Sequence, residues 1–393
     1  MSNDHIEPVL ALSSGIQHMT QHMVQNAKSL LSILSCSKKT PFSCKETVNI
    51  PVLLEEQMTF SFHFGATSND GSHLRRQLTA FQSADLSVFE TNIRFLGGFL
   101  SAYALTGDKM FKEKAIDVGN KLLPAFDTPT GIPQSMINLK TGGSHNWGWA
   151  SGGCSILAEF GSIHLEFIYL SNITGNKIYE QKVMKIRETL QQLKRPQGLY
   201  PIYLNPRTGK WGQHLFSVGA MGDSFYEYLL KTWLYTGKKD TVARQMYDEA
   251  VMPEGMICYF SFCRVNSLYV YAFVYVCLYP DINCFDFLIS GGMFALGAEG
   301  SSDPKKYIAL GEEIARTCHE SYNRSSTRLG PEAFRFEGHT EAKAMRQNEK
   351  YYILRPEVIE TYFYMWRFTK NKKYREWGWD AVQLDNLAMK VDL

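Results

Sequence analysis

Acidic residues recur at the start of helix-like runs along this chain. Glu90, Glu159, Asp223 and Glu357 each open a run of about 15 residues that ends on a turn signal. The runs, with a fifth one, close at positions 107, 175, 237, 300 and 370, which lie 68, 62, 63 and 70 residues apart. This period predicts two helices and two loops per unit. If successive hairpins curl round an axis, their carboxylates meet at one end, where they would suit acid/base hydrolysis.

The elements that must position these acids are helical hairpins. Each unit is expected to pair an inner and an outer helix. The helices predicted after the run from Glu90 to Leu105 are Lys112–Leu123, Ile156–Leu170, Tyr179–Leu193, Ser224–Tyr235, Thr241–Val251, Phe294–Leu296, Lys306–Tyr322 and Val358–Phe368. Gly97 and Gly98 interrupt the first run at a cost of roughly 1 kcal/mol each relative to alanine. We therefore expect the neighbouring helix to approach closely there.

Composition fits a folded protein with a large core. The chain has 393 residues, of which 45% are hydrophobic, and its net charge of +2 gives no sign of nucleic-acid binding. Eight cysteines without zinc-type spacing make a structural zinc site unexpected. Two sequons, Asn172-Ile173-Thr174 and Asn323-Arg324-Ser325, fit a protein of the secretory pathway. No signal-peptide pattern opens the chain, so delivery would need a segment that is not visible here.

Two regions lack a clean helical period. We expect residues 1–84 to form an irregular N-terminal region with part of a first hairpin, and residues 85–393 to form the helical domain. Residues 252–290 are predicted to be an atypical insert in that domain. Its apolar centre at 268–279 is shorter than the roughly 20 residues that a membrane helix needs. A buried strand or an aggregation-prone insert is therefore favoured over a membrane span.

Four longer segments have distinctive sequences: residues 89–98 (FETNIRFLGG), 146–151 (NWGWAS), 222–231 (GDSFYEYLLK) and 354–360 (LRPEVIE). They resemble the class I α1,2-mannosidases, glycoside hydrolase family 47, over about residues 85–250 and 290–382. The resemblance implies an all-α fold, an (α/α)7-type toroid of helical hairpins. It also implies an inverting mechanism and removal of α1,2-linked mannose from high-mannose N-glycans in the secretory-pathway lumen. The sequences of residues 219–224 and 315–321 resemble the Golgi branch of the family more than its endoplasmic reticulum branch.

The positions that match the family's motifs imply which residues form the site. The implied catalytic carboxylates are Glu90, Asp223, Glu332 and Glu357. The implied sugar-pocket residues are Arg94, Glu159, Arg355 and Glu360. Glu90 would act on the departing sugar oxygen and Glu357 would be the base that activates water. A glutamate at a helix start is also favoured by the helix dipole alone, so these assignments depend on the motifs around them.

The resemblance also implies a disulfide and a metal. Cys284 and Cys318 match the family's disulfide pair. A calcium ion is expected at the cavity floor, but the C-terminal segment with the family's threonine ligand is absent from this chain, so no metal ligand is assigned. We therefore expect calcium to bind more weakly here than in family members that have that ligand. The first and last hairpins are expected to be partial and the ring incompletely closed, as in an alternatively spliced product.

Three functions remain open from the sequence. The first is an α1,2-mannosidase, a glycosidase whose partners are high-mannose N-glycans on glycoproteins, with membrane association only through an anchor not seen here. The second is a catalytically impaired mannosidase-like protein that binds such glycans or glycoproteins. The third is an unrelated inverting α/α glycosidase acting on another polysaccharide. Retention of the site acids favours an active mannosidase over an impaired one. The distinctive sequence GDSFYEY disfavours an unrelated glycosidase.

Overall fold

The computed structural model describes residues 84–251 and 290–381, apart from residues 218, 220, 326, 327, 329, 332, 333, 338, 339 and 345–356. The chain divides into two compact units, Met1–Ala80 and Phe81–Leu393. All described residues belong to the second unit. The predicted irregular region and nearly all of the predicted insert at 252–290 lie outside the described residues.

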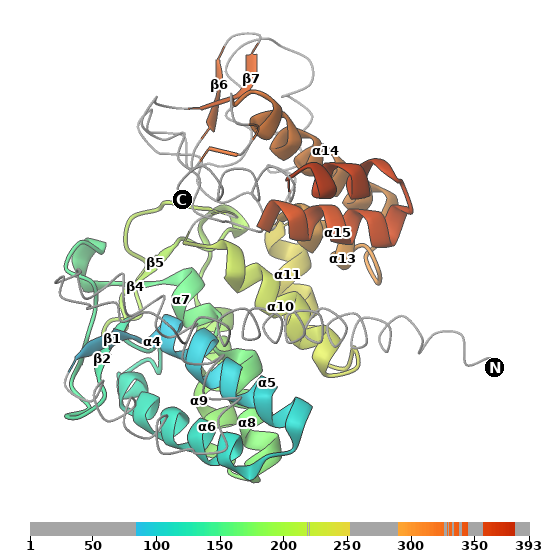
Figure 1. Cartoon of the computed structure of the whole chain (residues 1–393). Coiled ribbons are helices and arrows are strands. Elements are labelled where there is room, and N and C mark those ends of the chain that lie inside the picture. The colour runs from blue at the N-terminus through green and yellow to red at the C-terminus, as the bar shows by residue number, and fades with distance from the viewer. Residues whose placement is uncertain are drawn as a thin grey trace, which may run out of the picture. The chain divides into compact units, whose positions relative to one another are not determined.

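Helical hairpins follow one another along the chain (Figure 1). The first contains α4 (Val88–Glu90), the π-helical segment η3 (Thr91–Leu96), α5 (Gly97–Thr106) and α6 (Lys109–Leu122). The second contains α7 (Leu157–Gly161), α8 (His164–Thr174) and α9 (Ile178–Gln192). The third contains α10 (Asp223–Tyr235) and α11 (Thr241–Val251). Next come α13 (Ser290–Gly297) and α14 (Pro304–Asn323), then α15 (Glu357–Thr369) with a helical stretch at 373–381.

Packing separates an inner row of helices from an outer row. In the inner row α5 packs on α8, α8 on α10, α10 on α13 and α13 on α15. Each outer helix packs on the inner helix of its own hairpin, as α6 does on α5 and α14 does on α13. This succession is that of an α/α toroid and confirms the predicted all-α fold class. The number of hairpins and the incomplete closure of the ring stay predictions.

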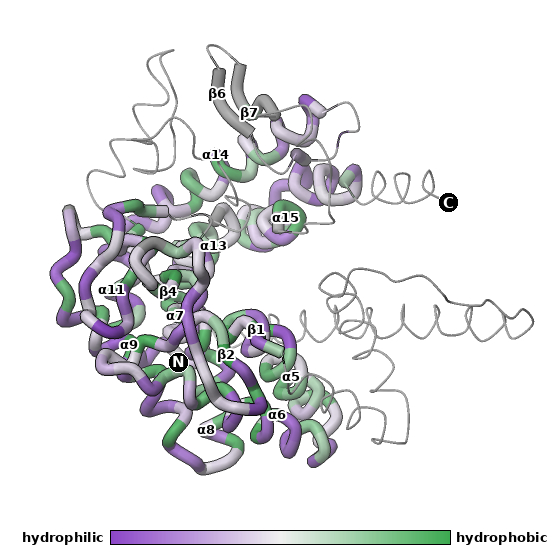
Figure 2. The backbone as a smooth tube through the Cα atoms, turned by 90° about the vertical axis from the view of Figure 1, so that its left-hand side faces the viewer, coloured by the Kyte–Doolittle hydropathy of each residue, from purple (hydrophilic) through white to green (hydrophobic). Residues whose placement is uncertain are grey.

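The two rows differ in how their side chains are distributed. Outer helix α6 buries Phe111, Ala115, Val118 and Leu122, which recur at steps of three and four. Green and purple segments accordingly alternate along it in Figure 2. Inner helix α13 is instead buried at every position from 291 to 297. A helix with neighbours on several sides needs apolar residues on all of them, whereas an outer helix needs only one apolar stripe.

Left-handed turns close the units as the repeat predicted. Gly107, Gly175, Gly237 and Gly300 have φ angles of 70°, 75°, 63° and 77°, and Lys370 has a φ of 58°. Gly107 N and Gly175 N each donate to the carbonyl four residues earlier, which satisfies an end of the helix. Glycine adopts this conformation without steric cost, whereas Lys370 has a Cβ and lacks that advantage.

Short strands hold the starts of two helices. β1 (Asp85–Ser87), β2 (Met136–Asn138) and β3 (Ser144–His145) form an antiparallel sheet, and β4 (Ser155–Ile156) pairs with β5 (Tyr203–Leu204). β1 continues directly into α4, and β4 continues directly into α7. The remaining short elements are η4 (Leu123–Phe126), η5 (Ser151–Gly153), η6 (Pro196–Gly198) and the antiparallel pair β6 (Phe334–Glu337) and β7 (Thr340–Ala344).

Two helices differ from their predicted form. The run that begins at Glu90 was expected to be a regular α-helix, but Thr91–Leu96 is a π-helix in which Gly97 N donates to Asn92 O. The run 156–170 is split after Gly161, and its second part begins at His164. Gly161 packs against α10, where an added Cβ would lie 2.5 Å from Phe225. Tertiary contacts therefore override the local helical pattern at both places.

Arg244 joins the third hairpin to the fourth. Its guanidinium donates two hydrogen bonds to Asp248, at 2.8 and 3.0 Å. It also donates to Glu299 O at 2.7 Å and to Gly297 O at 2.8 Å, both just past α13 or at its end. Tyr307 of α14 donates to Asp248 at 2.7 Å. A single buried arginine thus fixes α11 against two segments of the next unit.

No helix in the described part of the chain is both long enough and apolar enough to cross a bilayer. The apolar stretch at 268–279, for which a buried strand or an aggregation-prone insert was predicted, lies outside the described residues.

Candidate active site

Glu90 lies where a strand turns into a helix. It is the last residue of α4, and its backbone N donates to the Oγ of the capping residue Ser87 at 3.2 Å. Arg94 forms an ion pair with Glu90 within the first hairpin, as their spacing of four predicted. The side chains of Glu90 and Arg94 are 45% and 43% exposed. The pair is therefore accessible to a ligand.

Glu159 lies beside Glu90 at the start of the second hairpin. Trp147 donates from Nε1 to Glu159 Oε1 at 2.8 Å. Burial raises the pKa of the Glu159 carboxyl, the hydrogen bond from Trp147 opposes the rise, and the charge of Glu90 adds to it. α4, which ends at Glu90, also packs against α7, which contains Glu159. The predicted sugar-pocket residue is thus beside the predicted catalytic acid.

Asp223 opens α10 next to the same segment. Asp223 Oδ1 accepts a hydrogen bond from Ser224 N at 2.7 Å. The start of α10 is attached to α7 through the backbone of Ala158, whose N donates to Met221 O at 2.9 Å. Ser224 Oγ donates to the Ala158 carbonyl at 3.4 Å. Because Glu159 directly follows Ala158, the chain holds the helix starts with Glu159 and Asp223 together.

A tryptophan pair flanks this group of acids. The rings of Trp147 and Trp149 are stacked, with centroids 6.1 Å apart and planes at 26°. Trp147 also packs against a buried cluster, whereas Trp149 is 62% exposed. One ring is therefore partly a core residue and the other presents a free aromatic surface close to Glu159.

A second set of charged residues joins three inner helices. Lys231 of α10 forms an ion pair with Glu227, one turn earlier in the same helix. Burial alone would lower the pKa of Lys231, but Glu227, Tyr364 and Glu360 raise it above its ordinary value. Glu360 was predicted to line the sugar pocket and is brought to Lys231 by α15. The lysine therefore remains a cation among carboxylates from two hairpins.

Glu166 extends this set to α8. Asn92 Nδ2 donates to Glu166 Oε2 at 2.9 Å, and Tyr228 donates to Oε1 at 2.8 Å. Burial raises the pKa of Glu166, while its hydrogen bonds and the charge of Lys231 oppose the rise. Gly97 faces this carboxyl, since an added Cβ would lie 3.5 Å from Glu166 Oε1. The neighbouring helix α8 thus contacts Gly97, but at ordinary van der Waals distance and without the close approach that was expected.

The residues around Lys231 were missed from the sequence. Glu227 and Lys231 are four apart within the GDSFYEYLLK segment, which is a signal for a pair on one helix face. Glu166 follows Glu159 by seven residues, about two helical turns. That spacing placed it on the same side of the predicted run and could have marked it as an inner residue.

Comparison with known proteins identifies the family. Residues 67–392 match the model of glycosyl hydrolase family 47. The chain belongs to this family. It is 56% identical over 311 residues to mannosyl-oligosaccharide 1,2-alpha-mannosidase IB of Mus musculus, covering 76% of this chain and 47% of that protein. It is 54% identical over 311 residues to mannosyl-oligosaccharide alpha-1,2-mannosidase IA of Drosophila melanogaster, covering 76% and 45%. The chain thus spans about half the length of the curated relatives it matches.

Solved structures support the same fold. An alpha-1,2-mannosidase from Trichoderma reesei matches with a TM-score of 0.62 at 24% identity, covering 85% of this chain and 73% of that one. A D-mannose isomerase matches with a TM-score of 0.58 at 12% identity, covering 88% of each chain. At these identities the likeness concerns the fold, which is the toroid of helical hairpins.

Other family residues lie outside the described part. Glu332, Arg355 and Cys284 belong to residues that the structure does not describe. Glu357 is the first residue of α15, as predicted, and its side chain is not described. Cys318 is buried and carries a free thiol. Its pairing with Cys284 therefore stays a prediction that this structure does not support.

The described residues do not form a calcium site. Among them, no group of three or more His, Cys, Asp or Glu side chains is placed to hold a metal ion. A calcium ion prefers six to eight oxygen ligands. The described carboxylates do not fit this requirement, because Glu90 is paired with Arg94 and Glu227 with Lys231.

Proposed function

We propose that this chain is an inverting α1,2-mannosidase that trims high-mannose N-glycans in the secretory-pathway lumen, with the Golgi favoured over the endoplasmic reticulum. One observation carries the proposal: Glu90 and Asp223, two of the family's predicted catalytic acids, lie at helix starts that Glu159 and its segment bring together. Family membership supports mannose as the sugar, since the relatives named above are mannosidases. High-mannose N-glycans on glycoproteins are the proposed partners.

The proposed reaction needs an acid and a base on opposite faces of the sugar. A carboxylic acid gives its proton to the oxygen of the departing sugar as the bond from that oxygen to C1 breaks. Water attacks C1 from the other face and transfers a proton to a carboxylate base, which inverts the configuration. We assign the acid function to Glu90 and the base function to Glu357, with Asp223 and Glu332 as the other catalytic carboxylates.

The surroundings of the two neighbouring glutamates differ. Glu90 forms an ion pair with Arg94 and is partly exposed. Glu159 has a raised pKa because it is buried and lies near Glu90. The Glu159 carboxyl and the Arg94 guanidinium can each form a hydrogen bond with a sugar hydroxyl. We assign Arg94, Glu159, Arg355 and Glu360 to the sugar pocket, with the exposed ring of Trp149 as a surface for a sugar face.

Calcium enters only as an expectation from the family. When bound, a calcium ion would hold sugar hydroxyls through its open coordination positions. No step above is assigned to it, because the described residues do not form its site. Treatment with EDTA followed by calcium addition tests the requirement. A fall in mannose release that calcium reverses would mean that residues outside the described part supply calcium ligands, and an unchanged rate would remove calcium from the proposal.

The test compares matched glutamate variants. The purified full chain is incubated with a Man9 glycan, and released mannose is measured beside Glu90→Gln and Glu113→Gln. Glu113 is exposed on outer helix α6, so its variant is the control. Loss of an acid catalyst is expected to lower the rate by about 100-fold or more. The control should match the parent.

Three results would contradict the proposal. Product first formed as the α-anomer, observed by NMR, would exclude inversion. Binding of the Man9 glycan without release of mannose would favour the alternative of a catalytically impaired mannosidase-like protein. Equal rates for the parent and Glu90→Gln would remove Glu90 from the mechanism.

A further inference from the structure

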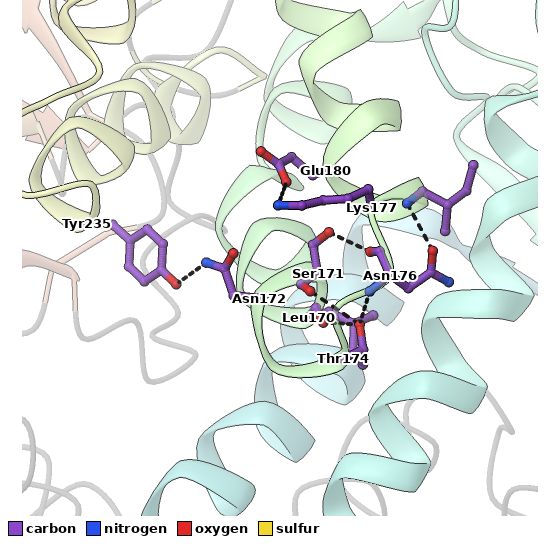
Figure 3. A network of polar contacts seen from close by, with 9 residues as sticks. Leu170, Ser171, Asn172, Thr174, Asn176, Lys177, Glu180 and Tyr235 are labelled. Carbon is purple, nitrogen blue, oxygen red and sulfur yellow. Dashed lines mark hydrogen bonds and ion pairs between the residues drawn. The ribbon is translucent and has the colours of Figure 1, made fainter.

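The sequon Asn172-Ile173-Thr174 lies in the last turn of α8 (Figure 3). Asn172 is exposed. The Thr174 hydroxyl donates to Leu170 O at 2.6 Å and accepts from Asn176 N at 3.2 Å. The sequon is thus an ordered part of a helix end, and its acceptor asparagine faces solvent.

An aromatic surface lies directly beside this asparagine. Asn172 Nδ2 donates to the hydroxyl of Tyr235 at 3.1 Å (Figure 3). Tyr235 ends α10 and is 45% exposed. Tyr169 lies near both Tyr235 and Tyr103, since both contribute to its electrostatic environment. Tyr235 therefore contacts the sequon from α10, and Tyr169 precedes Asn172 by three residues on α8.

This tyrosine cluster is distant from the candidate active site. Asp223 begins α10 and Tyr235 ends it. A separation of 12 residues at about 1.5 Å each gives roughly 18 Å along the helix axis. Glu159 precedes α8 in the same way, whereas Asn172 is near its end. A large group on Asn172 would leave the end with the acids open.

We propose that Asn172 carries an N-linked oligosaccharide whose first sugar packs against Tyr235. The inference rests on the proposed residence in the secretory-pathway lumen, where glycosyl transfer occurs. An apolar sugar face suits a tyrosine ring, which is amphipathic and rigid. The second sequon, at Asn323, serves as an internal comparison, because Asn323 is also exposed at a helix end.

The oligosaccharide is transferred to Asn172 from a lipid-pyrophosphate donor. The Asn172 amide nitrogen attacks C1 of the first sugar, so an N–C1 bond forms and the C1–O bond to pyrophosphate breaks. One amide proton passes to a base of the transferase, and the lipid pyrophosphate leaves. The substituted Nδ2 retains one hydrogen. It can therefore still donate to Tyr235 after modification.

The presence of a glycan on Asn172 is tested with the full chain, expressed in a eukaryotic cell with a cleavable signal peptide appended. Peptide N-glycosidase treatment in heavy-oxygen water marks every asparagine that carried a glycan. We expect the mark at Asn172 in the parent and in Thr174→Ser, and its loss in Thr174→Ala. An unmodified Asn172 in secreted protein whose signal peptide has been removed would overturn the proposal.

Packing on Tyr235 is tested separately. The glycan is trimmed to its first sugar, and the melting temperature is compared with that of Asn172→Gln. We expect the sugar to raise the melting temperature by about 1–3 °C in the parent and in Tyr235→Phe. The increase should disappear in Tyr235→Ala, and an unchanged increase there would overturn the packing.

The appended signal peptide separates this proposal from the proposed function. Because it forces entry into the lumen, an unmodified Asn172 counts against the site alone. Failure to release mannose counts against the proposed enzyme alone. Asn172→Gln should retain the parent's mannosidase rate, since Asn172 is remote from the acids.

Discussion

Replacement of Arg244 by methionine should destabilise the protein strongly. The guanidinium is 7% exposed and makes hydrogen bonds to Asp248 and to the carbonyls of Gly297 and Glu299. It also stacks 4.7 Å above the ring of Trp233. Methionine can keep much of the packing on that ring but has no donor. The variant therefore isolates the polar bonds that join the third hairpin to the fourth.

The magnitude follows from the partners left behind. Each of the two carbonyls loses a charged donor, which costs about 1–3 kcal/mol when the acceptor is buried. Asp248 is 36% exposed and keeps its bond from Tyr307, so its share is small. The sum is about 2–6 kcal/mol, which includes the range of about 3–5 kcal/mol found for breaking a buried charge pair.

Urea unfolding measures this loss, with Lys182→Met as the control. Lys182 pairs with Asp127 across two elements at 3.0 Å, but the two side chains are 27% and 70% exposed. Such a pair is worth about 0.2–1 kcal/mol. We expect a much lower urea midpoint for Arg244→Met than for Lys182→Met. Midpoints that fall equally would refute the argument from burial.

Three further predictions concern backbone space, protonation and a thiol. In Gly222→Ala, the new Cβ would lie 2.1 Å from the Ser217 carbonyl, so the start of α10 must shift. Mannose release should fall, with a loss of about 1–3 kcal/mol in urea, whereas Gly378→Ala, whose Cβ meets only Ile359 at 4.0 Å, should do neither. Glu166 has a folded-state pKa above its ordinary 4.5, so its contribution to stability is complete below about 4.5 and is lost as pH rises through the folded value. Glu166→Gln should flatten the fall of the urea midpoint above that pH, and parallel curves for variant and parent would contradict this. Burial raises the pKa of Cys318 to about 12, so iodoacetamide should label it only after unfolding. A Cys284–Cys318 peptide in an unreduced digest would instead establish the disulfide.

Turn chemistry made the repeat predictable from sequence. Gly107, Gly175, Gly237 and Gly300 close their units in left-handed conformations because the requirement is local to each turn. The pairing of Glu90 with Arg94 was also predictable, since spacing alone puts both on one face. Helical hairpins repeated in this way stack in chain order, which gives the fold class.

Longer-range contacts could not be predicted in the same way. The charge of Glu360 on α15 acts on Lys231, and Asn92 of η3 donates a hydrogen bond to Glu166. The partners are too far apart in the sequence for any spacing rule to predict these interactions. The break after Gly161 arises from packing against Phe225 of another hairpin. Each is set by how the inner helices meet, so it becomes visible only when they are assembled.

The π-helical turn lets the first hairpin hold one residue more than a regular helix would between Glu90 and α5. Each residue of an α-helix rotates the side-chain direction by about 100°, and the wider turn of η3 takes up that rotation. Deleting one residue between Thr91 and Leu96 would therefore give a regular helix in which Glu90 and α5 keep their relative directions. The same deletion in the regular part of α5 would turn Glu90 by about 100° against the end of that helix. The aim of the acid thus tolerates a lost residue in η3 but not one turn later.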